Sequence, residues 1–172
     1  MAGKEELRRL YDAHAEALFR FLLSLTRSEE ETREALQEVF VKLARRPGLL
    51  RKARDERAYL LRMARRAAID RIRSRASARR LAEQAAAEAQ ADSLFVKAAD
   101  PDEQAFREAV AAALAELPPE QRAAVHLKLW EGRTFEEIGK ILGISPNTAA
   151  SRYRYGLDKL RRRLRPLYEE IR

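Results

Sequence analysis

The chain has 172 residues and no cysteine, and its 35 lysines and arginines outnumber 27 aspartates and glutamates to give a net charge of +8. The length leaves room for one ordinary domain or two small ones, and the lack of cysteine excludes disulfides and thiolate metal sites. The positive charge favours a polyanionic partner such as nucleic acid, although a helical surface rich in salt bridges would have the same composition.

Helical periodicity predicts three helices in the first half of the chain. The first covers residues 4–26. The second begins after Ser28, which with Glu31 forms a capping box, and Pro47 ends it. The third begins near Asp55, and because its apolar residues cover more than one face, we expect it to be central in a helical bundle. The apolar stripe of the first helix consists of Leu7, Leu10, Tyr11, Leu18, Phe21, Leu22 and Leu25.

The composition changes after about Arg75. The run ASARRLAEQAAAEAQADSLFVKAADPDEQ is rich in alanine and polar residues and has too few large apolar side chains for a core of its own. We interpret it as a partly helical linker that ends near Asp102, with one long helix joining the two halves as the alternative. The chain then divides into a domain at 4–80, a linker at 81–103 and a domain at 104–172.

Short helices resume in the second half of the chain. One starts around Phe106 and stops at the proline pair 118–119, and the next covers residues 120–130. The candidate core residues of that next helix are Ala124, Val125, Leu127, Leu129 and Trp130. No run alternates with period two, so no sheet is expected. The prediction is an all-α protein with two small helical domains joined by a flexible linker.

The stretch TFEEIGKILGISPNTAASRYRYGLDKLRRRL is typical of a helix-turn-helix. Thr134 and Glu137 form a capping box, and Gly143 supplies the left-handed turn between the helices. Ser145 caps the second helix, in which Pro146 takes the first position. A seam with spacings of four, three and four is expected to be buried and consists of Ala149, Tyr153, Gly156 and Leu160.

The opposite face of this second helix is suited to DNA, because the first residues of a recognition helix meet base edges and flanking cations meet phosphates. Asn147, Ser151 and Arg154 can hydrogen-bond to bases or phosphates. The cations suited to the DNA backbone are Arg152, Lys159, Arg161, Arg162 and Arg163. The alternative is an amphipathic helix that faces solvent in a bundle.

Two further charged surfaces lie in the first half. The segment RMARRAAIDRIRSRASARR holds eight arginines and one acid, Asp70, which favours a polyanionic partner over the alternative of a solvated charge run. On the second predicted helix, a polar face lies opposite the apolar stripe and is suited to docking a protein, although helix surfaces are ordinarily charged. This face consists of Glu34, Gln37, Glu38 and Lys42.

Other functional classes have little support. No apolar run approaches the roughly 20 residues that span a bilayer, and the N-terminal MAGKEELRRL lacks the apolar core of a signal peptide, so we expect a cytoplasmic protein. His14 and His126 lie far apart with no ligand pattern, so no metal or cofactor is predicted. There is no His–carboxylate cluster and no GxxxxGK[ST] loop, so we do not expect an enzyme.

Three segments together resemble bacterial sigma factors. They are LQEVFVKLARR at 36–46, ERAYLLRMARRAAIDRIRSR at 56–75, and ELPPEQRAAVHLKLWEGRTFEEIGKILGISPNTAASRYRYGLDKLR at 116–161. Two domains with nothing between them resemble the extracytoplasmic-function group of the sigma-70 family, and the match covers about residues 4–170. In this resemblance the first domain is region 2 and the second is region 4.

The resemblance implies three sets of contacts. The set that docks on the clamp helices of the largest subunit of core RNA polymerase is Glu34, Gln37, Glu38 and Lys42. The set that engages and opens the minus-ten promoter element is Arg62, Arg65, Arg66, Asp70, Arg71 and Arg73. The set that reads the minus-thirty-five element is Asn147, Thr148, Ala150, Ser151, Arg152, Arg154 and Tyr155. A loop within 75–92 would hold an extruded base, and unstacking such a base costs a few kcal/mol.

Three positions depart from the pattern of many relatives. Arg66 stands where many have asparagine, Tyr59 where many have tryptophan, and Ala150 where a lysine or arginine is common. We therefore expect Ser151 and Arg154, with Asn147, to carry more of the upstream recognition.

The leading hypothesis is a non-catalytic sigma factor that directs bacterial RNA polymerase to specific promoters and assists transcription initiation and DNA opening. Its expected partners are core polymerase and promoter DNA, and the family often has an anti-sigma factor. The alternative is a stand-alone helix-turn-helix regulator with an N-terminal effector or dimerisation domain. That alternative predicts a dimer that binds DNA without polymerase, whereas a sigma factor binds DNA weakly alone and binds core polymerase stably.

Overall fold

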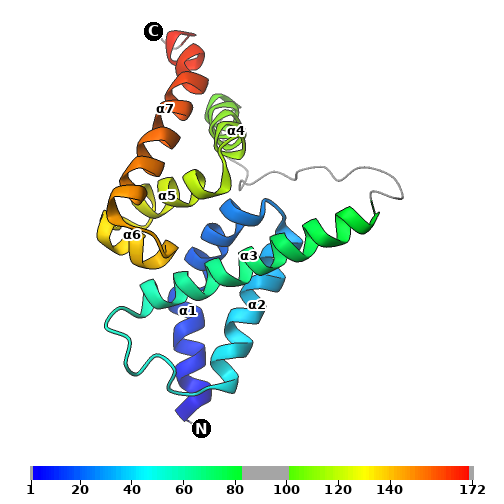
Figure 1. The fold of residues 1–172 in the computed structure, drawn as a ribbon, viewed down its shortest axis with the longest axis vertical. Coiled ribbons are helices and arrows are strands. Elements are labelled where there is room, and N and C mark those ends of the chain that lie inside the picture. The colour runs from blue at the N-terminus through cyan, green and yellow to red at the C-terminus, as the bar shows by residue number, and fades with distance from the viewer. Residues whose placement is uncertain (1, 83–100, 171–172) are drawn as a thin grey trace. The chain divides into compact units, whose positions relative to one another are not determined.

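The computed structural model describes residues 2–82 and 101–170, which form seven α-helices and no strand (Figure 1). The all-α prediction is confirmed. The chain divides into two compact units, Met1–Asp92 and Ser93–Arg172, and each is described by itself below.

The first unit consists of α1 (Ala2–Thr26), α2 (Glu29–Arg45) and α3 (Glu56–Ala82). Each helix packs on both of the others, so α3 is one side of a three-helix bundle and not its central helix. Apolar residues recur on more than one face of α3 because that helix contacts two neighbours. The largest fully buried apolar side chains of this core are Leu18, Phe21, Leu22, Val39, Leu60 and Leu61.

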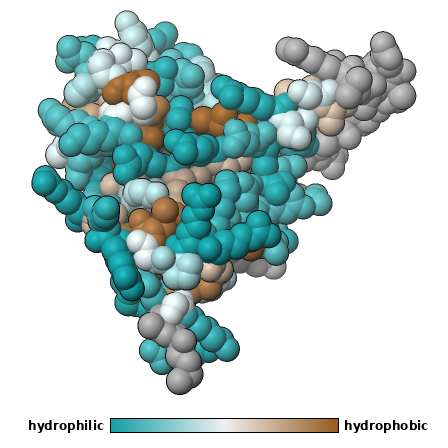
Figure 2. All heavy atoms as spheres, turned by 60° about the horizontal axis from the view of Figure 1, so that its bottom comes forward, coloured by the Kyte–Doolittle hydropathy of each residue, from teal (hydrophilic) through white to brown (hydrophobic). Residues whose placement is uncertain are grey.

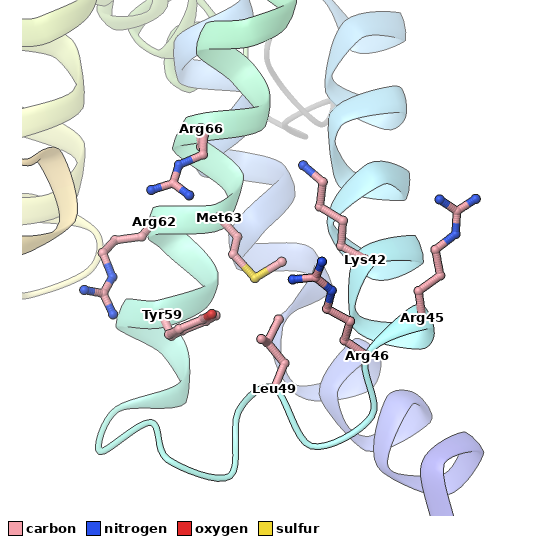
Figure 3. Close-up of a pocket in the computed structure, with 8 residues that line it drawn as sticks. All are labelled: Lys42, Arg45, Arg46, Leu49, Tyr59, Arg62, Met63 and Arg66. Carbon is pink, nitrogen blue, oxygen red and sulfur yellow. The ribbon is translucent and has the colours of Figure 1, made fainter.

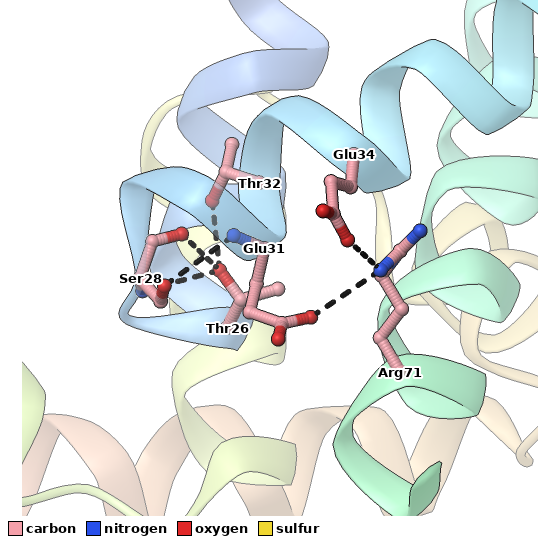
Figure 4. Close-up of polar contacts among 6 residues, drawn as sticks. All are labelled: Thr26, Ser28, Glu31, Thr32, Glu34 and Arg71. Atoms are coloured by element: carbon pink, nitrogen blue, oxygen red, sulfur yellow. Dashed lines mark hydrogen bonds and ion pairs between the residues drawn. The ribbon is translucent and has the colours of Figure 1, made fainter. Parts of the chain in front are cut away.

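The ends of these helices follow the predicted caps with one difference. Ser28 Oγ accepts a hydrogen bond from the Glu31 N–H at 3.3 Å, and Asp55 Oδ1 accepts one from the Ala58 N–H at 2.9 Å. The capping box expected at Ser28 is one-sided, because the Glu31 carboxylate turns toward Arg71 of α3 and not back to the cap (Figure 4).

The helix α3 runs past the point where a loop was expected. Residues 75–82 are helical, which leaves residues 83–92 for the predicted base-holding loop, and these lie outside the described part of the chain. Arginine and alanine favour helix, and no glycine or proline interrupts the run. At the other end of the expected linker, α4 begins at Pro101, a residue type that favours the first turn of a helix.

The second unit consists of α4 (Pro101–Ala115), α5 (Pro119–Leu129), α6 (Phe135–Leu142) and α7 (Pro146–Glu170). The helix α7 packs on α4, α5 and α6. One cluster of its core joins Ala113, Leu117, Val125 and Leu160. In the predicted seam, Ala149, Gly156 and Leu160 are buried and Tyr153 is half-buried against that cluster.

Three predicted core residues are instead exposed. Leu129 and Trp130 have 52% and 51% of their surface accessible, because the buried positions of α5 end at Leu127 and the helix ends two residues later. Trp130 stacks on His126 at 5.4 Å between ring centroids. Tyr11 is 53% exposed and covers Phe40 at the edge of the first bundle, with 4.9 Å between ring centroids.

Candidate polymerase and nucleic-acid interfaces

The two helices of the predicted helix-turn-helix are α6 and α7. Thr134 Oγ1 accepts from the Glu137 N–H at 3.2 Å and the Glu137 carboxylate accepts from the Thr134 N–H at 2.8 Å, which completes the capping box. That backbone hydrogen bond, together with the nearby Arg133 charge, lowers the pKa of Glu137. Gly143 has φ of +68°, the left-handed conformation that ends α6.

A close approach fixes the turn between α6 and α7. A Cβ atom on Gly139 would lie 2.7 Å from the backbone oxygen of Ile144, so only glycine fits without a shift. In the same way, a Cβ atom on Gly156 would lie 2.7 Å from Cγ2 of Val125. The two glycines therefore bring α7 close to α6 and α5, which sets the direction of its outer face.

The outer face of α7 carries most of the residues predicted for the upstream element. Asn147, Thr148, Arg154 and Tyr155 are exposed, and Ala150 and Ser151 are half-buried beside them. The Thr148 hydroxyl lies 2.8 Å from Ser145 Oγ, and Arg154 donates to Ser151 Oγ at 3.4 Å. Arg152 differs, because it pairs with Glu120 of α5 at 2.6 Å.

The outer face of α2 holds the four residues predicted for polymerase. Glu34, Gln37 and Lys42 are exposed and Glu38 is half-buried, and Lys42 pairs with Glu38 at 2.6 Å. Val41 lies between them along the helix with 38% of its surface accessible. Val41 was given no role from the sequence. An apolar residue at a polar position of the helical repeat could have marked it as a surface contact.

A basic pocket of about 580 Å³ lies between the end of α2, the segment after it and the start of α3 (Figure 3). It is lined by Lys42, Arg45, Arg46, Leu49, Tyr59, Arg62, Met63 and Arg66. Among the described residues that line it, five are cationic and none is acidic. Figure 3 shows Tyr59, Met63 and Leu49 between the two helices, and the Arg62 guanidinium lies 5.3 Å from the centre of the Tyr59 ring.

Only some of the residues that line this pocket were predicted from the sequence to have a role. Arg62 and Arg66 were predicted as minus-ten contacts and Tyr59 was noted as a departure from the family pattern. Arg45, Arg46, Leu49 and Met63 were not predicted from the sequence as part of a binding site. The signal for the first three of these was the RRPGLL run, which begins at the last residue of α2 and whose cations and leucines had no assigned place.

The predicted minus-ten residues divide between two sides of α3. Arg62, Arg66, Asp70 and Arg73 follow one another at spacings of four, four and three, so they share one side, and all four are exposed. Arg65 is half-buried at another position of the helical repeat. Arg71 turns to α2, where it pairs with Glu34 and lies 3.6 Å from Glu31 (Figure 4).

The start of α3 is held by a separate ion pair. Arg9 of α1 donates two hydrogen bonds to Glu56, at 2.8 and 3.0 Å, and this lowers the pKa of the Glu56 carboxyl. His14 Nε2 lies 3.9 Å from the same carboxylate, while burial lowers the pKa of His14. The first turn of α3, which precedes Tyr59 and Arg62, is thereby tied to α1.

The surface of the molecule is mostly polar. Hydrophilic residues cover most of the face in Figure 2, with small separate apolar patches. None of the described helices is both long and apolar enough to cross a membrane. Within residues 2–82 and 101–170, no group of three histidine, aspartate or glutamate side chains comes together to hold a metal ion.

Comparisons with known proteins decide the family. The family model described as Sigma-70 region 2 matches residues 10–78, and the one described as Sigma-70, region 4 matches residues 107–160. The ECF RNA polymerase sigma factor SigL of Mycobacterium tuberculosis is 33% identical over 164 residues, which are 94% of this chain and 90% of that protein. The chain belongs to the extracytoplasmic-function group of the sigma-70 family.

Other relatives of this sigma factor agree. The RNA polymerase sigma factor CarQ of Myxococcus xanthus is 32% identical over 94% of this chain and 91% of that protein. The ECF sigma factor SigX of Bacillus subtilis is 27% identical over 98% and 88%. The sigma factor RpoE of Bartonella quintana, solved with the anti-sigma factor NepR, superposes with a TM-score of 0.76 over 94% of this chain and 98% of that one; at 20% identity it shows the fold.

Sigma factors of this family direct RNA polymerase to promoters, and this chain is one of them. Region 2 contains the outer face of α2, the basic pocket and the exposed side of α3. Region 4 contains the helix-turn-helix, and the basic residues Arg161, Arg162 and Arg163 follow the segment that the family model matches.

Proposed function

We propose that this sigma factor binds core RNA polymerase through the outer face of α2, holds the opened minus-ten strand against α3, and reads the minus-thirty-five element with α7. The observation that carries the proposal is the basic pocket beside α2, whose described lining combines five cations with no acid. A surface of that charge is suited to bind a nucleic-acid phosphate backbone. The sigma factor itself needs no catalytic group, because polymerase performs the chemistry.

The pocket is our proposed place for the extruded base, in place of the segment after Arg75. Tyr59, Met63 and Leu49 offer an aromatic ring and apolar surface against which an unstacked base can lie. The surrounding arginines can pair with phosphates on either side of that base. The exposed side of α3 continues from the pocket through Asp70 and Arg73, which gives the strand a path along the helix.

For the upstream element, we propose that the first three turns of α7 enter the major groove. Asn147, Ser151 and Arg154 can reach base edges or phosphates, and Tyr155 adds an exposed ring with 61% of its surface accessible. Ala150 presents only a methyl group. Arg152 is engaged with Glu120, so we assign it a smaller share of DNA binding than Arg154.

For polymerase, we propose that Gln37, Glu38 and Lys42 meet the clamp helices of the largest subunit, with Val41 as an apolar contact among them. The segment 81–103 would connect the two domains that bind promoter DNA. Linking two weak contacts raises their combined affinity without a new contact. An anti-sigma factor is a further proposed partner, supported by the NepR complex of the Bartonella quintana protein. We also propose that the protein acts in the cytoplasm, with RNA polymerase.

The decisive experiment is reconstitution with core RNA polymerase, followed by transcription from a pool of random promoters. We expect a stable complex with core polymerase and transcripts that start downstream of a shared pair of motifs. Glu38→Gln and Gln37→Ala should weaken that complex without changing the melting temperature. A dimer that binds duplex promoter DNA tightly and ignores core polymerase would support the stand-alone regulator in its place.

A further inference from the structure

An ion pair joins the two helices that carry the proposed polymerase and promoter contacts. Arg71 of α3 pairs through Nη1 with Glu34 of α2 and lies 3.6 Å from Glu31 Oε2 (Figure 4). The family resemblance implies a contact of Glu34 with polymerase and of Arg71 with DNA. In the folded domain each of these residues has the other as its partner.

The position of Arg71 on α3 explains this pairing. Arg71 follows the buried residues Leu60, Ala64 and Ala67 at spacings of four, three and four, so its Cα lies on the side of α3 that packs in the bundle. Its side chain is 29% exposed, compared with 26% for Glu31 and 48% for Glu34. The exposed side with Arg62, Arg66, Asp70 and Arg73 points elsewhere, so Arg71 is poorly placed for a strand that follows those residues.

The two carboxylates define where the guanidinium lies. Glu31 and Glu34 are three residues apart, and such residues are neighbours on one helix face. One cation between two carboxylates on one helix, with all three side chains partly screened from water, resists sliding and rotation of α3 against α2. A single exposed ion pair contributes little to stability, but a network of several charges with defined geometry contributes more.

We infer that Arg71 is a positioning residue: with Glu31 and Glu34 it sets the promoter-facing side of α3 relative to the polymerase-facing side of α2. The inference rests on the proposed function, since it concerns the same two surfaces. It assigns Arg71 no direct contact with DNA. It also gives Glu34 a role within the domain in addition to any contact with polymerase.

A double-mutant cycle tests this arrangement. Glu34→Gln, Arg71→Gln and the double variant are assembled with core polymerase, and open-complex formation is measured by fluorescence of 2-aminopurine placed in the minus-ten element. We expect each single change to slow opening about two- to fivefold and the double change to slow it by less than the product of the two single effects. Additive effects would overturn the inference, because they would mean that each residue serves its own partner.

A matched cycle uses Glu38→Gln, which neutralises another acid of α2 that pairs with Lys42. Glu38→Gln and Arg71→Gln should combine additively. A second readout is the salt dependence of promoter binding by the assembled polymerase. Arg66→Gln should lower the slope of log affinity against log salt by about one, whereas Arg71→Gln should leave the slope unchanged. A slope lowered equally by both variants would make Arg71 a phosphate contact and overturn the inference.

The melting temperature of each variant checks that it folds. If Arg71→Gln does not fold, the cycle is run with Arg71→Met, which keeps an aliphatic side chain but removes the charge that pairs with Glu34 and Glu31, and the same criterion of coupling or additivity applies. Failure of the unmodified protein to bind core polymerase would defeat the proposed function itself. Normal binding by the unmodified protein, with additive variants, would defeat only the role of Arg71.

Discussion

Arg152 of the recognition helix pairs with Glu120 of α5 at 2.6 Å, although Arg154, two residues further on, points to the exposed side of the same helix. Two arginines in one short run therefore have different surroundings. The successive positions of a helix differ by 100°, so two residues apart means more than half a turn. One cation ties α7 to its own domain and the other is available to a ligand.

The first prediction follows from this difference. Arg154→Gln should weaken binding of the assembled polymerase to its upstream element about tenfold and lower the salt slope by about one, because one cation leaves the DNA surface. Arg152→Gln, the matched control, should change the slope by much less and lower the melting temperature slightly. Electrophoretic mobility shifts at several salt concentrations measure both. Equal slopes for the two variants would contradict the separation of their roles.

The second prediction concerns the basic pocket. Tyr59→Ala should reduce open-complex formation about tenfold, because loss of one stacking ring costs roughly 1–3 kcal/mol per base. Binding to core polymerase should be unchanged, since Tyr59 is not on the outer face of α2. Permanganate footprinting of unpaired thymines measures opening. Tyr11→Ala removes an exposed tyrosine of the same domain and is the control; an equal loss with both variants would argue against a base in the pocket.

The third prediction concerns the turn of the helix-turn-helix. Gly139→Val should destabilise the second unit by about 1–3 kcal/mol, because its Cβ would lie 2.7 Å from the Ile144 backbone oxygen and overpacking costs that much. The single tryptophan, Trp130, lies in this unit and reports its unfolding in urea by fluorescence. Lys140→Val places the same side chain at the exposed neighbouring position and should change stability by much less. A stable Gly139→Val protein would mean that the turn can relax.

The fourth prediction concerns pH and the start of α3. Burial lowers the pKa of His14, and the neighbouring Arg57 and Arg9 charges act in the same direction, while the facing Glu56 carboxylate opposes them. A histidine whose pKa is lower in the folded chain binds fewer protons there than in the unfolded chain, so stability falls as the pH drops below about 6.5. The free energy of unfolding should therefore fall between about pH 7 and pH 5.

The variant His14→Gln should lose this slope, as measured by urea denaturation followed by circular dichroism at several pH values. A second decline should appear below about pH 4.5, where the Glu56 carboxyl, whose pKa is lowered in the folded chain, takes up a proton and loses its pairing with Arg9. Glu56→Gln should reduce that second decline and enlarge the first, because the Glu56 carboxylate otherwise raises the pKa of His14. An unchanged slope in His14→Gln would show that other groups govern the upper range.

The sequence predicted the parts of this protein that depend on neighbours along the chain. The capping box of Thr134 and Glu137, the left-handed turn at Gly143 and the periodic stripes of α1, α2 and α7 are local, because each involves residues within about one helical turn. The ordered motifs that resemble sigma regions 2 and 4 also lie in the sequence itself. The fold class and the family followed from these.

Only the tertiary structure decided which side chains meet. Arg71 and Glu34 are 37 residues apart in the chain, and Arg152 and Glu120 are 32 apart; no helical repeat relates such positions. Leu129 and Trp130 look like core residues until the packing of α5 shows where the buried face ends. The basic pocket has the same origin, because it exists only where the RRPGLL run is folded against Tyr59, Arg62 and Arg66. Packing between elements that are far apart in the sequence decides which charged side chains pair and where a pocket forms. Helical periodicity carries no information about either.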